Sequence, residues 1–143
     1  MTLFERRFPG ASDRPALALH CMMGSSNAWA PMADHLGGAV DLRAFDNPGH
    51  GRSPDWQPQD GIDLHTFVTR YAAGQINRPL DLIGHSFGAT VALRIAVGAP
   101  EAIRALTLIE PVLFAVAPAP ARQAEIDRLA PFAATDDIDG MIG

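Results

Sequence analysis

Short apolar runs alternate along the chain with longer segments in which apolar residues recur every three or four positions. This alternation is typical of a mostly parallel sheet covered by helices on both faces, so the sequence predicts an α/β fold. We expect strands at residues 3–8, 16–20, 40–45, 80–84 and 106–110, and helices at 26–36, 63–76 and 87–98.

The predicted helix ends follow from residues that favour caps and stops. Gly24–Ser26 offers an N-cap for the first helix, and Gly37 and Gly38 end it. Asp63 is expected to cap the second helix. The third helix is rich in alanine and carries Val91, Leu93, Ile95 and Val97, so we expect it to be buried on most sides. Beyond residue 110, four prolines bracket one short helical pattern around residues 126–129.

Composition and charge narrow the class of protein. The 143 residues are 48% apolar and 19% charged, enough for a compact domain with a core. A net charge of −5 gives no electrostatic footprint for nucleic acid or an anionic membrane. The single Cys21 excludes an internal disulfide and favours a reducing cytosol. No signal peptide is evident, and the apolar stretch 111–121 is too short and proline-rich to span a membrane. We therefore expect a soluble, cytoplasmic protein.

The sharpest chemical signal is the sequence Gly-His-Ser-Phe-Gly at residues 84–88, where a predicted strand meets a predicted helix. A serine on such a turn takes a strained conformation that pushes its hydroxyl out of the sheet, and the flanking glycines avoid collisions with neighbouring backbone. Alone the pattern is weak, and Ser86 could instead be a helix N-cap. Its position between strand and helix favours a nucleophile.

Two further motifs precede this turn. Residues 19–26 look like an H-G-x-x-G-S oxyanion loop, and residues 46–53 resemble a D-x-P-G-H-G-x-S loop. With the turn at 84–88, these motifs occur in the order of the α/β-hydrolase fold superfamily, which the chain resembles over residues 3–114. The resemblance implies that residues 1–114 are the N-terminal part of a hydrolase core. Residues 115–143 would be the beginning of a helical cap or a disordered tail.

By this resemblance Ser86 is the nucleophile, and the backbone N–H groups of Met22 and Phe87 form the oxyanion hole. The positive end of the helix that starts at Phe87 adds to this stabilisation. Cys21 stands where the family usually has glycine, and a positive φ there would cost about 1 kcal/mol. Cys21 as an alternative nucleophile has little support in the sequence.

A serine nucleophile also needs a base, and the family order is serine, acid, histidine. All five histidines precede Ser86, so none occupies the expected place of the base. His20 and His50 are expected to order the oxyanion side by hydrogen bonding. His85 neighbours the nucleophile but should point away from it. The two remaining histidines, His35 and His65, are expected on helix surfaces.

Glu110 is the candidate acid, because some family members, such as haloalkane dehalogenases, place the acid at this strand end. The alternative is a carboxylate that lines the pocket or bonds loop amides. The later acidic residues are expected at the surface: Asp127, Asp136, Asp137 and Asp139. Apolar side chains expected near Ser86 are Trp29, Phe87, Met22, Met23 and Phe114.

These observations favour the N-terminal half of a serine hydrolase that acts on a small-molecule ester, thioester or similar acyl substrate. Lacking the histidine, the fragment is expected to be inactive. The alternative is a non-catalytic binding or interaction module on a hydrolase scaffold. No metal or organic cofactor is implied. An open sheet edge and an exposed apolar helix face also predict self-association of the isolated chain.

Overall fold

The computed structural model describes residues 1–58, 61–112 and 118–135. The chain forms two compact units, Met1–Val112 and Leu113–Gly143, and each is described by itself. The domain boundary predicted after residue 114 lies outside the described residues, as does Phe114.

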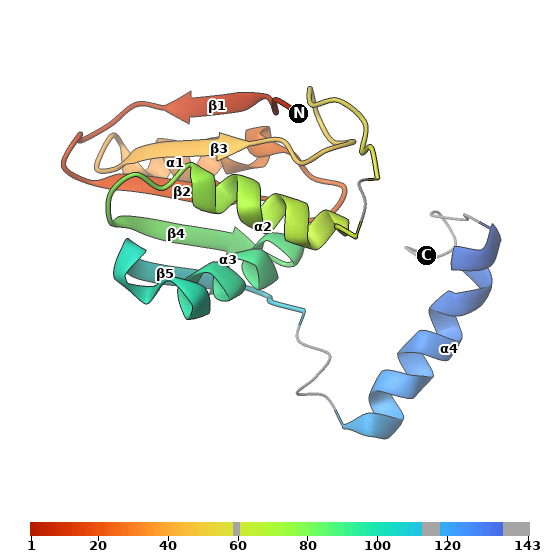
Figure 1. The fold of residues 1–143 in the computed structure, drawn as a ribbon. Coiled ribbons are helices and arrows are strands. Elements are labelled where there is room, and N and C mark those ends of the chain that lie inside the picture. Colours follow the sequence, from red (N-terminus) through yellow and green to blue (C-terminus); the bar gives the residue numbers. More distant parts are fainter. Residues whose placement is uncertain (59–60, 113–117, 136–143) are drawn as a thin grey trace. The chain divides into compact units, whose positions relative to one another are not determined.

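The first unit is built on one five-stranded sheet with the order β1-β3-β2-β4-β5. Its strands are β1 (Glu5–Phe8), β2 (Pro15–Leu19), β3 (Asp41–Phe45), β4 (Leu80–His85) and β5 (Ile103–Ile109). Strand β1 is antiparallel to β3, and the other neighbouring pairs are parallel. The predicted α/β class with a mostly parallel sheet is thus confirmed (Figure 1).

Helices cover both faces of this sheet. The short 3₁₀ helix η1 (Ser26–Trp29) and helix α1 (Ala30–Leu36) pack on one face, where Trp29 joins a core cluster with Leu42. Helices α2 (Leu64–Gly74) and α3 (Phe87–Gly98) lie side by side on the other face (Figure 1). There Val68 and Val91 are fully buried against the strands. A 3₁₀ turn, η2 (Pro100–Ala102), leads into β5.

The starts of α2 and η1 differ in how they are capped. Asp63 caps α2 as expected, accepting the Thr66 N–H at 2.7 Å. The cap predicted at Gly24–Ser26 is correct in position, because Ser25 is the N-cap residue of η1, but its side chain makes no capping bond. The buried Ser26 donates its N–H to Asp46. The predicted helix 26–36 is present as one continuous helical segment, which begins as the 3₁₀ helix η1 and continues as α1 with Pro31 in its first turn.

Two other elements differ from their predictions. Val91 and Ile95 of α3 are buried, but Val97 is 75% exposed, so burial on most sides does not extend to the end of the helix. Strand β5 begins at Ile103, before the predicted 106, because its polar Arg104 pairs with Asp81 of β4 at 3.0 Å. Because this ion pair compensates the charge of Arg104, the strand can begin before the apolar run from which it was predicted.

Strand β5 forms one edge of the described sheet. It pairs with β4 and with no other described strand. Its residues Ala105, Leu106 and Thr107 are exposed. The sequence predicts an open sheet edge, and β5 is exposed along most of its length at such an edge.

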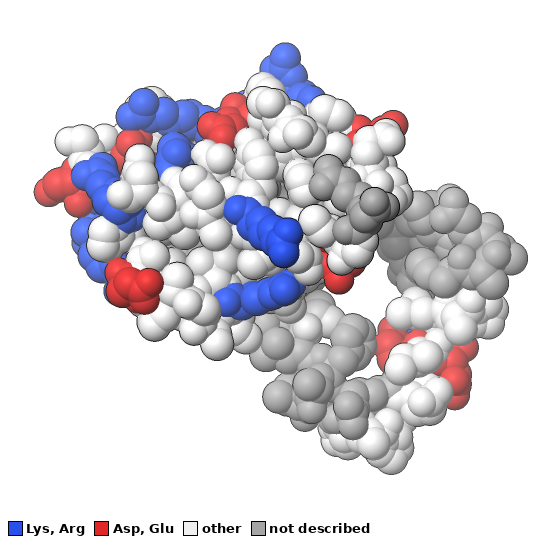
Figure 2. Space-filling model, in the orientation of Figure 1, with Lys and Arg blue, Asp and Glu red and all other residues white. Residues whose placement is uncertain are grey.

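In the second unit, helix α4 (Ala119–Thr135) is longer than the short pattern predicted around residues 126–129, and it contains Pro131. Asp127 is exposed, as expected, whereas Asp136, Asp137 and Asp139 lie outside the described residues. None of the described helices is both long and apolar enough to cross a bilayer. On the face of the molecule in Figure 2, basic and acidic side chains are interspersed over the first unit.

Candidate active site

Ser86 occupies the sharp turn between β4 and α3. Its backbone has φ 54° and ψ −112°, in the left-handed range that costs a residue with a Cβ on the order of 1–2 kcal/mol. The Ser86 N–H donates to the Ile109 carbonyl of β5 at 2.9 Å, which ties the turn to the sheet. The strained serine conformation expected from the sequence is therefore present, and such strain is common at functional sites.

Gly84 and Gly88 make this turn sterically feasible. A Cβ at Gly84 would lie 2.3 Å from the Gly88 carbonyl oxygen, and a Cβ at Gly88 would lie 2.1 Å from the Leu19 carbonyl oxygen. Both distances are far below van der Waals contact, and both neighbours are backbone atoms that cannot rotate away. Close approach of α3 to β4 and β2 thus requires glycine at both positions, as expected from the sequence.

A cavity of about 290 Å³ adjoins Ser86. It is lined by Met22, Ser86, Phe87, Thr90 and Val112. Of the apolar residues expected here, Met22 and Phe87 are present. Trp29 is not, because it is buried in the core on the opposite face of the sheet. Met23 is 64% exposed and does not line the cavity.

Two backbone N–H groups beside this cavity are free to donate. Neither the Met22 N–H nor the Phe87 N–H makes a hydrogen bond with any described residue. Phe87 is the first residue of α3, so its N–H lies at the positive end of the helix dipole. The cavity is therefore lined by Ser86 and by the two residues, Met22 and Phe87, whose N–H groups are predicted to form an oxyanion hole.

The first motif loop is a tight turn from Cys21 to Gly24, closed by a bond of 3.0 Å from the Gly24 N–H to the Cys21 carbonyl. Its left-handed residue is Met23, with φ 66°. A positive φ at the third residue is typical of a type II turn. The strain considered for Cys21 therefore falls on Met23, and Cys21 carries a half-buried free thiol.

His20 is 1% exposed and uses both ring nitrogens. Its Nε2 accepts the Asn47 N–H at 2.9 Å, so its Nδ1 carries the proton and donates to the Cys21 carbonyl at 2.6 Å. Burial lowers the pKa of His20, which favours this neutral state.

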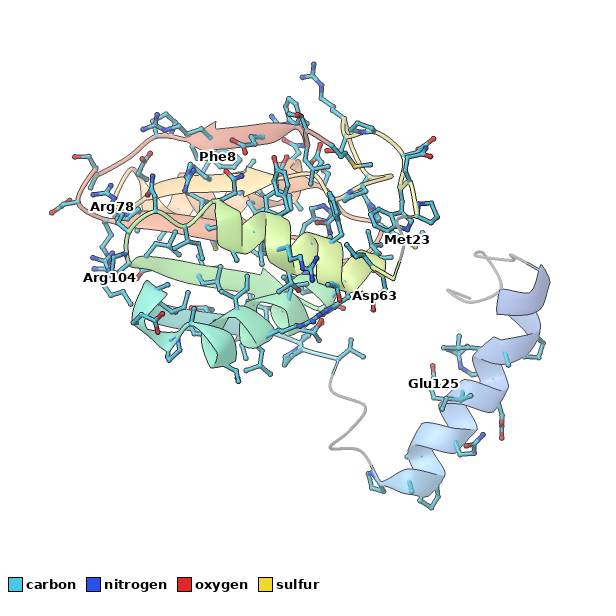
Figure 3. The ribbon with its side chains drawn as sticks, in the orientation of Figure 1. Phe8, Met23, Asp63, Arg78, Arg104 and Glu125 are labelled. Carbon is cyan, nitrogen blue, oxygen red and sulfur yellow. The ribbon has the colours of Figure 1, made fainter. Side chains whose placement is uncertain are left out.

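His50 makes the corresponding contacts on the other side of the turn. Its Nε2 accepts the Met23 N–H at 2.9 Å, and its Nδ1 lies 3.0 Å from the Pro48 carbonyl. Met23 and the turn that carries it lie at the end of the sheet toward which β4 points (Figure 3). The two imidazole rings are 5.3 Å apart between centroids. His20 and His50 thus form hydrogen bonds that connect the two motif loops.

Asp46, at the start of the second motif loop, was not singled out from the sequence. Its carboxylate is buried and accepts the Ser26 N–H at 2.7 Å and the Arg52 N–H at 2.8 Å. Burial alone would raise the pKa of Asp46, but these hydrogen bonds outweigh it and lower the pKa. A Cβ at Gly51 would collide with the same carboxylate. The available signal was an acidic residue directly after a buried strand, where a buried charge requires several donors.

The other three histidines are also described. His35 is exposed on α1, as expected. The expected surface position of His65 is wrong, because the ring is half-buried between α2 and α3. Its Nε2 lies 3.0 Å from Thr90 Oγ1 and its Nδ1 lies 3.2 Å from an Arg94 nitrogen. Burial, followed by the charge of Arg94, lowers the pKa of His65.

His85 points toward Glu110, with its Nε2 3.8 Å from the Glu110 carboxylate. No histidine of the chain forms a hydrogen bond with Ser86 Oγ, and all five are among the described residues. Glu110 follows β5 with φ 48°, and its side chain is 86% exposed. It is thus beside His85 and forms no hydrogen bond with Ser86. Within the described ranges, no group of three or more His, Cys, Asp or Glu side chains is arranged to hold a metal ion.

Comparison of the whole chain with known protein families gives an independent indication of its fold. The model of the Alpha/beta hydrolase family matches residues 16–141. The chain belongs to this family.

Curated relatives of the chain include lipases, esterases and other hydrolases, and also a synthase and an acetyltransferase component. Lipase LipV of Mycobacterium tuberculosis (strain ATCC 25618 / H37Rv) is 33% identical over 114 residues, 78% of this chain and 42% of that protein. A pimeloyl-[acyl-carrier protein] methyl ester esterase of Neisseria meningitidis serogroup C / serotype 2a (strain ATCC 700532 / DSM 15464 / FAM18) is 42% identical over 104 residues, 73% of this chain and 39% of that protein.

Solved structures show the same fold. The 2-hydroxy-6-oxo-6-phenylhexa-2,4-dienoate hydrolase of Rhodococcus sp. strain RHA1 superposes with a TM-score of 0.67 at 24% identity, over 93% of this chain and 54% of that chain. The chain thus spans roughly half of this structure and about two fifths of the two curated relatives.

Proposed function

We propose that this chain carries the nucleophile and the oxyanion hole of a serine hydrolase that cleaves small esters, thioesters or similar acyl compounds. The observation that carries the proposal is the strained Ser86 at an apolar cavity that also adjoins two unpaired N–H groups. Relatives named as a lipase and a methyl ester esterase support an acyl substrate.

In the proposed reaction, Ser86 Oγ forms a bond to the acyl carbon while an electron pair moves onto the carbonyl oxygen. The N–H groups of Met22 and Phe87 stabilise the oxyanion, and loss of one such donor typically lowers kcat by roughly 10²–10³. Collapse of the intermediate expels the alcohol or thiol and leaves an acyl-enzyme, which water then hydrolyses. The serine proton passes to a base and from there to the leaving group.

The base is the part of the reaction that this chain's histidines do not supply. His20, His50 and His65 have both ring nitrogens engaged, and His85 faces Glu110. We therefore propose that the isolated chain turns over substrate poorly, and that an external base restores part of the reactivity of Ser86.

Labelling of the purified chain with a fluorophosphonate tests this proposal, with and without added imidazole. We expect slow labelling that imidazole accelerates and that Ser86→Ala abolishes. Ser12→Ala is the matched control, because Ser12 is an exposed serine that lies outside the three motifs and should label like the wild type. Equal labelling of the Ser86→Ala variant would contradict the assignment of the nucleophile.

The second candidate function is a non-catalytic binding module on the hydrolase scaffold. The lack of a histidine partner for Ser86 is the observation that favours it. A folded chain that remains unlabelled in the presence of imidazole would establish this alternative over catalysis.

Glu110 enters the proposal as the acid that orients the base. Its left-handed backbone supports a functional role, because strained residues other than glycine concentrate at such sites. As an orienting acid, Glu110 should be required for imidazole-accelerated labelling, so Glu110→Gln would slow it. As a partner of His85 only, the same substitution would leave labelling unchanged.

A further inference from the structure

The turn from Cys21 to Gly24 is held by imidazole rings on both sides of Met22. On one side His20 Nδ1 donates to the Cys21 carbonyl, and on the other His50 Nε2 accepts the Met23 N–H. Each ring is fixed in turn by the second motif loop, through the Asn47 N–H and the Pro48 carbonyl. The turn is therefore connected to the second loop at both flanks of the residue predicted to donate to the oxyanion.

The His20 contact sets the direction of the Met22 N–H. The Cys21 carbonyl and the Met22 N–H belong to one planar trans peptide, so they point in opposite directions. The Cys21 oxygen is occupied by His20 and by the Gly24 N–H, which leaves the Met22 N–H directed away from both. Met22 itself lines the Ser86 cavity.

The His50 contact stabilises the less favoured form of the turn. A type II turn needs a positive φ at its third residue, and Met23 has a side chain that disfavours it. A type I turn would remove this strain by rotating the peptide between Met22 and Met23, and it would turn the Met23 N–H away from His50. The bond to His50 Nε2 thus opposes a rotation next to the predicted oxyanion donor.

We propose that His20 and His50 are positioning residues that clamp the Cys21–Gly24 turn so that the Met22 N–H is presented to the oxyanion. The inference rests on the proposed function for its catalytic part. Neither ring touches the cavity, so both act through the turn rather than on the substrate.

His50 offers the cleaner test, since it is half-buried whereas His20 is fully buried. His50→Phe keeps a ring of similar size but removes the acceptor, and His50→Gln retains an acceptor at the end of a side chain of similar reach. His35→Phe, the same substitution at an exposed histidine of α1, is the matched control.

Two measurements on the full chain separate clamping from general stability. The first is hydrogen exchange of the backbone amides by NMR. We expect the Met23 N–H to exchange about tenfold faster in His50→Phe, with amides of β2 and β4 unchanged and with protection retained in His50→Gln. Unchanged Met23 exchange in His50→Phe, or an equal acceleration throughout the core, would overturn the clamp.

The second measurement is the rate of Ser86 phosphonylation in the presence of imidazole. We expect a reduction of about tenfold in His50→Phe at saturating probe, with the half-saturating probe concentration unchanged, and near wild-type rates in His50→Gln and His35→Phe. A wild-type rate in His50→Phe would overturn the positioning role. If the wild type is not phosphonylated at all, the proposed function fails, while amide exchange still decides whether His50 clamps the turn.

Discussion

Replacement of Gly88 by alanine should destabilise the first unit strongly, because the added methyl group meets backbone rather than side chains. Its Cβ would lie 2.1 Å from the Leu19 oxygen and 2.8 Å from the His20 oxygen. Real Cβ contacts of this kind are above 3 Å, so α3 or the end of β2 must move by about 1 Å. Overpacking of this kind costs typically about 1–3 kcal/mol, and we expect the upper end because no rotamer change relieves it.

Gly98→Ala is the matched control for this prediction. Gly98 ends the same helix, and a Cβ there meets nothing within 4 Å, so its free energy of unfolding should stay within about 1 kcal/mol of the wild type or rise. Urea unfolding followed by tryptophan fluorescence, to which the buried Trp29 contributes, measures both variants. A midpoint for Gly88→Ala equal to that of Gly98→Ala would refute the argument that backbone contact requires glycine at position 88.

Two other perturbations follow from the described contacts. Asp46→Asn should cost about 1–3 kcal/mol at neutral pH, because one of the two N–H groups that donate to the buried carboxylate loses its acceptor. The pKa of Asp46 is lowered in the folded state, so its stabilisation is present above about pH 4 and is lost as pH falls through the lower folded value. Urea titrations between pH 3 and 7 should therefore show a weaker acid dependence in Asp46→Asn, and an unchanged slope would contradict this account. The exposed edge strand β5 should promote self-association of the chain. Sedimentation equilibrium should therefore show dimers or larger species, and Leu106→Lys should reduce their fraction. A wild-type chain that is monomeric at all concentrations would exclude association through β5.

The fold followed from the sequence wherever apolar spacing and local chemistry acted together. The third predicted helix is found at Phe87–Gly98, and Asp63 caps α2 through a bond to the third residue beyond it. Both features depend on residues close in sequence, so a single sequence contains the information that determines them.

Predictions failed where a distant partner decides the local structure. Ser25 stands at the cap position of η1 without a capping bond, and the N–H of Ser26 is satisfied by Asp46, twenty residues away along the chain. Strand β5 starts at Ile103 because Arg104 can pair with Asp81 on the neighbouring strand. The sequence predicts His65 on a helix surface, yet α3 supplies Thr90 and Arg94 as partners for its ring. Periodicity along one segment cannot show such partners, because they arise only when the sheet and helices have assembled.

The difference between local determinants and distant partners also explains which parts of the candidate site could be predicted. The glycines around Ser86 could be understood locally, since a strand-to-helix turn needs close backbone approach. The strain in the first loop could not, because the left-handed residue is Met23 and the His50 ring that bonds it comes from another loop.

One arrangement therefore connects the three sequence motifs physically. Gly88 brings α3 against the Leu19 and His20 carbonyls, and His20 in turn bonds the turn that carries Met22. A displacement at Gly88 would thus reach both predicted oxyanion donors, Phe87 through α3 and Met22 through His20. The distances that make Gly88 necessary for stability are the same distances that place the nucleophile turn beside the oxyanion loop. For this reason we expect Gly88→Ala to slow labelling of Ser86 even in the fraction of molecules that remains folded.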